Sequence, residues 1–418
     1  MRDRNLWNHS CAEQFDAPIL DADLTADLLI IGGGFTGCSA ALEAEKQGAK
    51  VVLIEARTIG FGGSGRNVGL VNAGLWLPPD TVCQRMGQAA GERLNTTLAE
   101  APDAVFSLID EHGIQCEAIR NGTLHCAHSK GGLDDLITRY EQQLRRGAPV
   151  QLLDAAQTAQ ATGTDVYYGA LQDMRAGTLQ PLGYVRGLAR AAAQAGTQIF
   201  ENSSVMQLGF SGDWLARCKS GSVRAKSLIL ATNAYHTGFR GAESVRMTPV
   251  NFFQLATPPL PASLLNEILG QHQGCWDTGL VMTSFRKDKA GRFILGAMGL
   301  PDRMGIHENW ARRAMARLFP GLKDQSFEFF WSGRIGMSVD YIAKIQRLGE
   351  RGYSAFGFSG RGIGPGTVIG RSLARAVLNG DETALPIAPI DAYQDKLRVA
   401  KGLWIEAGAR AIHFTGAR

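Results

Sequence analysis

Residues 26–55 carry the pattern that most constrains the fold of this chain. Residues 28–31 are apolar and partly β-branched, which is typical of a strand buried on both faces of a sheet. A glycine-rich turn follows, then a segment with helical spacing at about 35–47, then a second apolar strand that ends in an acid at residue 55. This order predicts a parallel strand–helix–strand unit and therefore an α/β fold of the Rossmann type. The turn contains Gly32, Gly34 and Gly37, which match the spacing G-x-G-x-x-G.

The three glycines and the acid together indicate a bound dinucleotide. Gly32 allows the sharp turn, Gly34 lets a pyrophosphate approach the backbone, and Gly37 lets the helix pack closely on the strand. The N-terminus of the helix directs free N–H groups and a positive dipole end at the phosphates. Glu55 is placed to bind a ribose 2′-hydroxyl and would repel a 2′-phosphate, so the sequence predicts FAD or NAD rather than NADP.

Composition and charge exclude several other classes of protein. With 418 residues the chain is long for a single core, so two domains are expected. The net charge of +4 is too small, without a basic run, to indicate nucleic-acid binding. No apolar stretch reaches the ~18 residues of a membrane span, and no apolar signal core follows the first methionine, so a cytoplasmic location is expected. The seven cysteines are scattered and the histidines lack ligand spacing, which favours reduced thiols and no metal site.

The pattern of apolar and polar residues changes along the chain and predicts a discontinuous domain organisation. Segments 251–257, 280–286 and 292–298 alternate between apolar and polar residues, as antiparallel strands beside a cavity do. We expect a nucleotide-binding domain interrupted by a strand-rich substrate (cap) domain. The nucleotide-binding domain is assigned residues 1–90, 150–240 and 335–418, and the cap is assigned residues 91–149 and 241–334.

Two further glycine-rich loops are candidates for contact with the ligand. Residues 60–74 read Gly-Phe-Gly-Gly-Ser-Gly-Arg-Asn-Val-Gly-Leu-Val-Asn-Ala-Gly, a composition suited to placing backbone N–H groups along a pyrophosphate or a flavin edge. Residues 357–366 read Gly-Phe-Ser-Gly-Arg-Gly-Ile-Gly-Pro-Gly and precede a helix whose first N–H groups would stabilise negative charge. A flexible surface loop and an ordinary strand-to-helix turn are the respective alternatives.

These motifs, taken in order, resemble those of the FAD-dependent amine and amino-acid oxidases of the D-amino-acid oxidase superfamily, which includes glycine oxidase and monomeric sarcosine oxidase. The matching motifs are Gly-Gly-Gly-Phe-Thr-Gly at 32–37, the run from Glu55 to Gly69, and Gly-Phe-Ser-Gly-Arg-Gly at 357–362. Together with Leu6-Trp7 near the N-terminus, they are most similar to the γ-glutamylputrescine oxidase-like branch. The resemblance implies a Rossmann-like FAD-binding domain of the glutathione-reductase type with an inserted cap of antiparallel sheet and helices.

The resemblance also implies which residues hold FAD. The ADP half would lie against the glycine turn and the acid, with Val205 at the adenine; Ala231 and Thr232 would flank the pyrophosphate. The second glycine loop would follow the pyrophosphate and the isoalloxazine, and the third would face the pyrimidine edge. The full expected set is Gly32, Gly34, Phe35, Thr36, Gly37, Glu55, Ala56, Arg57, Gly63, Ser64, Gly65, Arg66, Asn67, Val68, Gly69, Val205, Ala231, Thr232, Gly360, Arg361, Gly362, Ile363 and Gly364.

Several positions depart from the family pattern. Gly63 and Val68 replace an alanine and a glycine, so the flavin loop is not a copy. Arg361 replaces the histidine of the third loop and places a permanent cation there. Gly364 stands where relatives carry an oxygen-activating lysine, which leaves the electron acceptor open. No cysteine follows Cys275, so the expected FAD is non-covalent.

The resemblance further implies oxidation of a C–N bond in a small amine or N-substituted amino acid. Hydride would pass to flavin N5, the imine would hydrolyse, and O2 would reoxidise the flavin to give H2O2. The alternatives are an amine dehydrogenase with another acceptor, a pyridine-nucleotide-dependent flavin reductase, and a non-enzymatic nucleotide-binding module. Three arginines are candidates for a substrate carboxylate, with Arg361 favoured over Arg334 and Arg286. The expected pocket walls, which could equally be cap core, are Phe252, Phe253, Met282 and Phe285.

Overall fold

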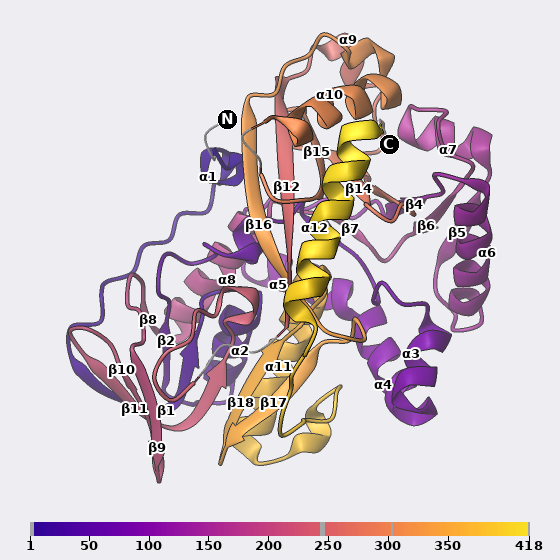
Figure 1. The fold of residues 1–418 in the computed structure, drawn as a ribbon. Helices are drawn as coiled ribbons and strands as arrows, with labels where there is room; N and C mark the ends of the chain where they lie inside the picture. The colour runs from indigo at the N-terminus through magenta and orange to yellow at the C-terminus, as the bar shows by residue number, and fades with distance from the viewer. Residues whose placement is uncertain (1–3, 243–246, 302–303, 417–418) are drawn as a thin grey trace.

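A computed structural model describes residues 4–242, 247–301 and 304–416 of the chain. Two eight-stranded sheets dominate it, as Figure 1 shows, and the expected α/β fold with a second, mostly antiparallel sheet is confirmed. The first sheet has the order β17-β18-β11-β1-β2-β8, and the hairpin β9–β10 continues from β11. These strands are β1 (Asp23–Ile31), β2 (Val51–Ile54), β8 (Gln198–Phe200), β9 (Gln207–Ser211), β10 (Asp213–Arg217), β11 (Ser222–Leu230), β17 (Lys344–Gly349) and β18 (Gly352–Phe356).

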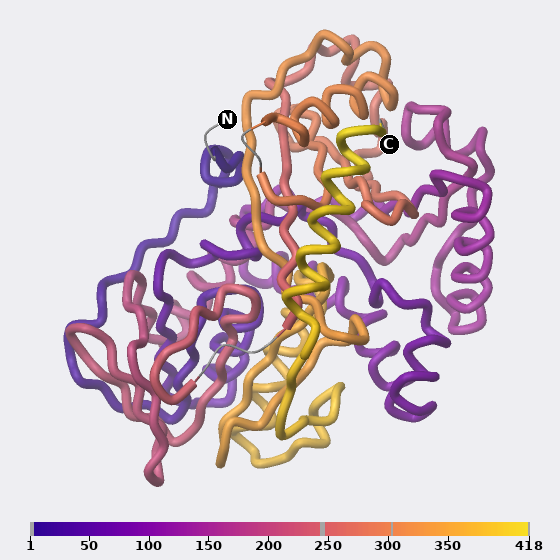
Figure 2. The backbone as a smooth tube through the Cα atoms, viewed as in Figure 1, coloured from indigo at the N-terminus to yellow at the C-terminus, as the bar shows by residue number. Residues whose placement is uncertain are grey.

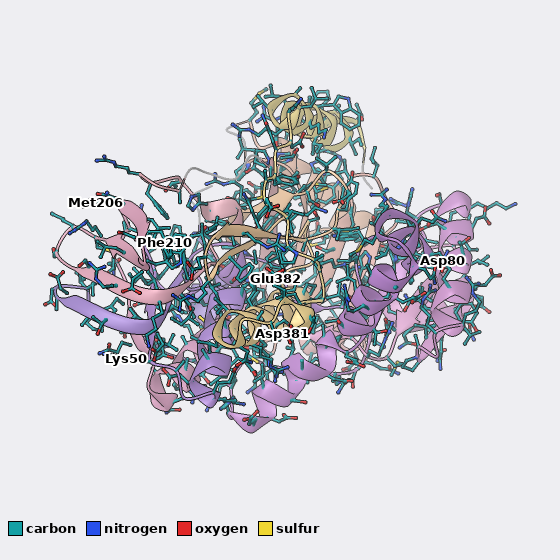
Figure 3. All side chains as sticks on the ribbon, turned by 90° about the horizontal axis from the view of Figure 1, so that it is seen from below. Lys50, Asp80, Met206, Phe210, Asp381 and Glu382 are labelled. Carbon is teal, nitrogen blue, oxygen red and sulfur yellow. The ribbon has the colours of Figure 1, made fainter. Side chains whose placement is uncertain are left out.

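The first sheet is parallel from β18 to β8, and both of its faces are covered. Leu28 and Ile30 face a core formed with three helices, while Leu29 and Ile31 face a second core that includes Trp214 of β10. This double burial explains the continuous apolar run that predicted β1. The hairpin β9–β10 forms one edge of the molecule, where Figure 3 labels the exposed Phe210. The three helices are α2 (Phe35–Lys46), α8 (Pro181–Ala195) and α11 (Ile363–Asn379).

The second sheet has the order β16-β12-β15-β14-β13-β4-β6-β5, and only β13 and β4 pair in parallel. One face packs on an aromatic core that contains Phe253, Phe285 and Trp310. Figure 1 shows the C-terminal helix, in yellow, lying across β12. The strands are β4 (Thr123–Cys126), β5 (Val150–Leu153), β6 (Ala170–Asp173), β12 (Thr248–Pro259), β13 (Gly274–Asp277), β14 (Thr283–Lys287), β15 (Arg292–Met298) and β16 (Phe329–Met337). The accompanying helices are α6 (Lys130–Leu144), α7 (Ala155–Thr162), α9 (Ala262–Leu265), α10 (Ile306–Leu318) and α12 (Arg398–Thr415).

The sheets divide the chain differently from the expected domain boundaries. β5 and β6 pair with β4 in the second sheet, although residues 150–240 were assigned to the nucleotide-binding domain. α12 packs on β12 and not on the first sheet. Two helices assigned to the cap, α4 (Gln88–Ala99) and α5 (Ala101–Glu111), instead contribute to the core beside α11. Alternation identifies a strand but not its partner, because pairing is set by long-range register.

The N-terminal segment connects the two sheets. Arg4 donates a backbone hydrogen bond to the Phe330 carbonyl of β16 at 2.7 Å, and Leu20 donates one to Ser203 Oγ after β8 at 2.9 Å. Figure 2 shows this indigo stretch running from one lobe to the other. The remaining elements are α1 (Leu6–Ser10), α3 (Pro79–Met86), and the short pair β3 (Leu70–Val71) and β7 (Gly177–Thr178). In the described part of the chain, every helix is too short or too polar to cross a membrane.

Candidate active site

A cavity of ≈ 310 Å³ lies between the carboxyl ends of β1, β2 and β11 and one face of the second sheet. In open parallel sheets this is where ligands bind. Most of the residues expected to hold FAD line it. They are Gly32, Gly34, Phe35, Thr36, Glu55, Ala56, Gly63, Ser64, Asn67, Val68, Val205, Ala231, Thr232, Gly360, Arg361, Gly362 and Ile363.

Other expected residues lie behind the cavity wall and shape the backbone. A Cβ at Gly37 would overlap the Gly32 carbonyl oxygen, so the third glycine of the motif sets the close packing of α2 on the turn. Gly65 and Gly69 are equally confined by backbone carbonyls. Gly364 faces the Ala101 Cβ, which a Cβ at 364 would approach to 3.1 Å. The expected residues outside the lining are Gly37, Arg57, Gly65, Arg66, Gly69, Gly364 and Arg286.

Glu55 closes β2 beside the glycine turn and is held in place by backbone donors. Its Oε2 accepts from Gly33 N and its Oε1 from Arg57 N, both at 2.8 Å, and each oxygen keeps a lone pair for a ligand. Burial, together with repulsion from Glu201, raises the pKa of Glu55. Sequence reasoning missed Glu201, which is buried and whose Oε1 accepts from Ile59 N at 2.5 Å. Its only signal was its place directly after a short strand.

The second glycine loop is fixed by its own side chains. Ser64 Oγ accepts from Phe35 N at 3.1 Å and so joins the loop to the first turn of α2. Asn67 donates to the carbonyls of Gly63 and Ser64, at 2.9 and 3.0 Å, and accepts from Gly69 N at 2.9 Å. Asn67, which is among the residues expected to contact FAD, therefore also orders the loop.

Two tryptophans hold the same loop from outside. Trp7 Nε1 donates to the Asn67 carbonyl at 2.8 Å, and Trp331 Nε1 donates to the Arg66 carbonyl at 2.9 Å. Arg66 Nη1 reaches the Ser332 carbonyl at 2.9 Å, so this cation binds β16 rather than lining the cavity. The loop is thus clamped between the N-terminal helix and the second sheet.

The chain fits a dinucleotide at this edge. Gly32 has φ +113°, and a Cβ at Gly34 would come within 2.9 Å of Ser64 Oγ, so side chains there would narrow the cradle. α2 and α11 both begin at the cavity, at the caps Gly34 and Gly362, and present positive dipole ends to it. Among the residues described, no three His, Cys, Asp or Glu side chains form a group that could hold a metal ion.

Arg361 lies inside the cavity between two indole rings. Its guanidinium carbon is 4.4 Å from the ring centre of Trp76 and 4.8 Å from that of Trp276. Trp276 stacks in turn on His125, with ring centres 4.9 Å apart. Burial and the neighbouring Arg139 lower the pKa of Arg361 to about 9, so it remains charged at neutral pH. Burial also holds the pKa of His125 well below its ordinary value, so this ring is neutral.

Two donors of the Arg361 guanidinium have no hydrogen-bond partner in the part of the chain that the structure describes. Within the described residues its Nε and Nη1 are buried and unpaired, an arrangement that costs free energy unless a ligand satisfies them. The two other candidate arginines are placed differently. Arg286 donates to the Leu179 carbonyl at 2.9 Å, lies over Trp7 and is outside the cavity lining. Arg334 is exposed and reaches the cavity while stacked over Tyr235 at 5.4 Å.

Strand alternation decides which expected wall residues reach the cavity. Phe252 and Met282 line it. Phe253 and Phe285 point to the opposite face of the sheet and belong to the aromatic core. Gln254, which sequence reasoning did not single out, lines the cavity two positions after Phe252. A glutamine inside an otherwise apolar strand was the available signal.

The fold and the cavity define a dinucleotide-binding protein of the Rossmann type, and the comparisons with known proteins identify its family. The family of FAD-dependent oxidoreductases (DAO) matches residues 27–376, and the chain belongs to it. FAD as cofactor and an FAD-dependent oxidoreductase activity are thereby confirmed.

Three known proteins illustrate this relationship. The probable oxidoreductase OrdL of Haemophilus influenzae is 30% identical over 390 residues, covering 91% of this chain and 89% of the relative. The gamma-glutamylputrescine oxidoreductase of Escherichia coli is 28% identical over 367 residues, covering 87% and 85%. The crystal structure of glycine oxidase from Geobacillus kaustophilus superposes with a TM-score of 0.71 at 21% identity, covering 87% of this chain and 96% of that one.

Proposed function

We propose that this enzyme oxidises a C–N bond of a small amine or amino acid that carries a carboxylate, and that Arg361 binds this carboxylate. The observation that carries the proposal is a buried guanidinium that lines the FAD-side cavity and has two donors without a partner in the described structure. A carboxylate would supply both the missing counter-charge and the acceptors, in a geometry that a guanidinium matches. The names of two relatives, gamma-glutamylputrescine oxidoreductase and glycine oxidase, support an amine or amino acid as substrate.

The chain's own residues orient the substrate and keep the reacting carbon dry. FAD, when bound, supplies the acceptor for the hydride that leaves the carbon next to nitrogen. Arg361, held between two indole rings, fixes the anionic end of the substrate. Phe252, Met282 and Met298 give the cavity apolar walls that exclude water from the other end. A neutral amine needs no protein base to lose hydride, and the resulting imine hydrolyses in water.

The residues proposed to hold FAD follow from the cavity lining. The glycine turn and Glu55 would hold the ADP half, and the loop around Ser64 would follow the pyrophosphate. Val205, Ala231 and Thr232 border the same side of the cavity. The stretch 360–363 follows β18 at the same edge of the first sheet, opens α11 and would face the flavin.

The electron acceptor is proposed to be O2, with H2O2 as product; a separate acceptor is the alternative. Position 364 is a glycine buried against α5, and it therefore supplies no side chain that could activate oxygen in the cavity. Peroxide release and oxygen uptake with the best substrate would support the oxidase. Flavin reduction by substrate that is followed by slow reoxidation in air would assign the alternative.

The substrate proposal is tested by anaerobic reduction of the bound flavin. The panel contains N-methylglycine, 4-aminobutyrate and the neutral amide of N-methylglycine, with 2-hydroxy acids and NADH as negative controls. We expect carboxylated amines to bleach the flavin and Arg361→Met to lower their kcat/KM on the order of 100-fold, about 3 kcal/mol. Arg334→Met, at an exposed cavity position, is the matched control. Equal losses for the acid and its amide would remove Arg361 from carboxylate binding, and reduction by NADH alone would favour a reductase.

A further inference from the structure

Four residues of the second sheet form a single row across neighbouring strands. Gln254 of β12 is paired with Gly296 of β15, Gly296 with Ser284 of β14, and Ser284 with Trp276 of β13. Directly paired residues of antiparallel strands point to the same face. Gln254, Ser284 and Trp276 all line the cavity, so this row is the part of the sheet that faces the ligand.

The row contains two of the unpaired polar groups of the cavity. Gln254 Oε1 and Trp276 Nε1 are buried and, like Arg361 Nε and Nη1, lack a hydrogen-bond partner within the described structure. Trp276 is also the ring that stacks on Arg361. Three side chains from separate elements thus line one cavity and carry buried groups without a partner in the described structure. Each such group costs free energy when empty, which favours a ligand that satisfies all of them.

Gly296 makes room for the glutamine. A Cβ at position 296 would overlap the amide group of Gln254, so the amide lies over the glycine, in the middle of the row. The position next in the row, Ser284, carries only a small side chain. Because Gly296 has no side chain and that of Ser284 is small, the Gln254 amide has room to lie directly against the sheet.

The donors and the acceptor have opposite chemical preferences. The donors on Arg361 and Trp276 suit an anion. Gln254 Oε1 is an acceptor and suits an N–H group. We propose, building on the proposed function, that Gln254 Oε1 accepts a hydrogen bond from the nitrogen of the substrate while Trp276 Nε1 joins Arg361 at its carboxylate. The substrate class is then primary or secondary amines, whose nitrogen keeps a hydrogen, and not tertiary amines.

A neutral acceptor also suits the chemistry. Hydride leaves only a neutral amine, because an ammonium has no lone pair to donate into the forming C=N bond. A carboxylate at position 254 would stabilise the ammonium and raise the pKa of the bound amine. An amide binds the N–H without that charge preference. Gln254 is therefore a positioning residue whose neutrality matters as much as its oxygen.

The first test removes the acceptor. Gln254→Met keeps most of the side-chain volume, and Gln172→Met, at a buried glutamine on β6 outside the cavity lining, is the matched control. The second-order rate constant for anaerobic reduction of the flavin is measured with N-methylglycine and with its tertiary counterpart N,N-dimethylglycine. We expect wild type to prefer the secondary amine, and Gln254→Met to lose roughly tenfold or more with it but less than threefold with the tertiary amine. Equal losses with both amines would overturn the proposal.

The second test uses charge. Gln254→Glu is expected to shift the acidic limb of the pH profile for flavin reduction at saturating substrate upward by about one unit, because this rate reports the bound amine and the new carboxylate favours its ammonium form. A purely structural role would lower the rate without moving the profile. An unshifted profile in a folded, FAD-loaded variant would therefore contradict the proposal.

A binding measurement without turnover separates the two ends of the site. Methoxyacetate carries a carboxylate but no nitrogen, and its dissociation constant is followed by perturbation of the flavin spectrum. Trp276→Phe and Arg361→Met should weaken it, whereas Gln254→Met should leave it unchanged. Weakening by Gln254→Met would assign the amide to the anion and overturn this inference. Failure of the proposed function would look different, since no carboxylated amine would then reduce the wild-type flavin.

Discussion

Trp7 and Trp331 meet edge to face with ring centres 5.7 Å apart, and their indole N–H groups bind consecutive carbonyls of the flavin loop. Both rings are fully buried, and 324 positions separate them in the sequence. The loop that lines the cavity is thus shaped by a contact between α1 and β16, the edge strand of the second sheet. Residues that never line the cavity can therefore control how FAD is held.

Removing either indole donor should loosen that loop. Trp331→Phe and Trp7→Phe keep an aromatic ring but leave a loop carbonyl without its partner. We expect each to weaken FAD binding by ~1 kcal/mol, roughly fivefold, in a titration of apoprotein with FAD. The double variant should show a coupled, non-additive effect because both donors act on one loop. Unchanged affinity in both single variants would show that the loop holds its shape without them.

Gly37 should tolerate no side chain. Because a Cβ there would overlap the Gly32 carbonyl oxygen, Gly37→Ala must push α2 away from the turn. The free energy of unfolding should fall by about 1–3 kcal/mol, and FAD should be retained poorly. Gly209→Ala is the control, since a Cβ at that hairpin position meets nothing within 4 Å. Chemical denaturation measures the free energy of unfolding of both variants. Equal decreases at the two positions would contradict the packing argument.

FAD binding should weaken as the solution is acidified through the pKa of Glu55. Burial raises that pKa above 4.5, and a ribose hydroxyl that donates to the ionised carboxylate lowers it again. Binding therefore releases a proton, so the dissociation constant rises as pH falls below the raised pKa. Glu55→Gln should bind FAD roughly ten- to a hundredfold more weakly at neutral pH and lose this dependence. A dissociation constant in wild type that is flat across mildly acidic pH would argue against Glu55 as the ribose ligand.

The flavin should leave the protein without a covalent adduct. All seven cysteines are buried, and none is among the residues that line the cavity. Acid precipitation should therefore release FAD, identified chromatographically, into the supernatant. Yellow colour that remains in the washed pellet, or FMN in the supernatant, would refute this expectation.

Local sequence patterns were sufficient for the nucleotide-binding edge. The glycine spacing and the apolar runs at 28–31 and 51–54 predicted β1, α2 and β2 in place, because each depends on contacts only a few residues away. The strand expected at 292–298 has the bounds of β15. The expected helix at 35–47 likewise coincides with α2 to within a residue.

Long-range pairing could not be predicted in the same way. The partners of β5 and β6 and the position of α12 depend on register and packing between distant segments. Gln254 illustrates the point: its amide lies over Gly296, its partner on a strand about forty residues further along the chain. The sequence favoured Arg361 among the three candidate arginines, and the structure separates it from Arg286 by its place in the cavity lining and from Arg334 by its burial.

The order of strands in the first sheet has a consequence for how the enzyme acquires its cofactor during synthesis. β1 lies beside β11, and β11 lies beside β18, so the nucleotide edge draws on segments from near both ends of the chain. The start of α11, which also lines the cavity, follows β18 at the same edge of the sheet. A nascent chain that has emerged only as far as β2 carries the glycine turn but not the rest of the cavity. The complete cavity needs α11, so we expect FAD to bind only after that helix has been synthesised and to stabilise the finished fold rather than serve as a template for it.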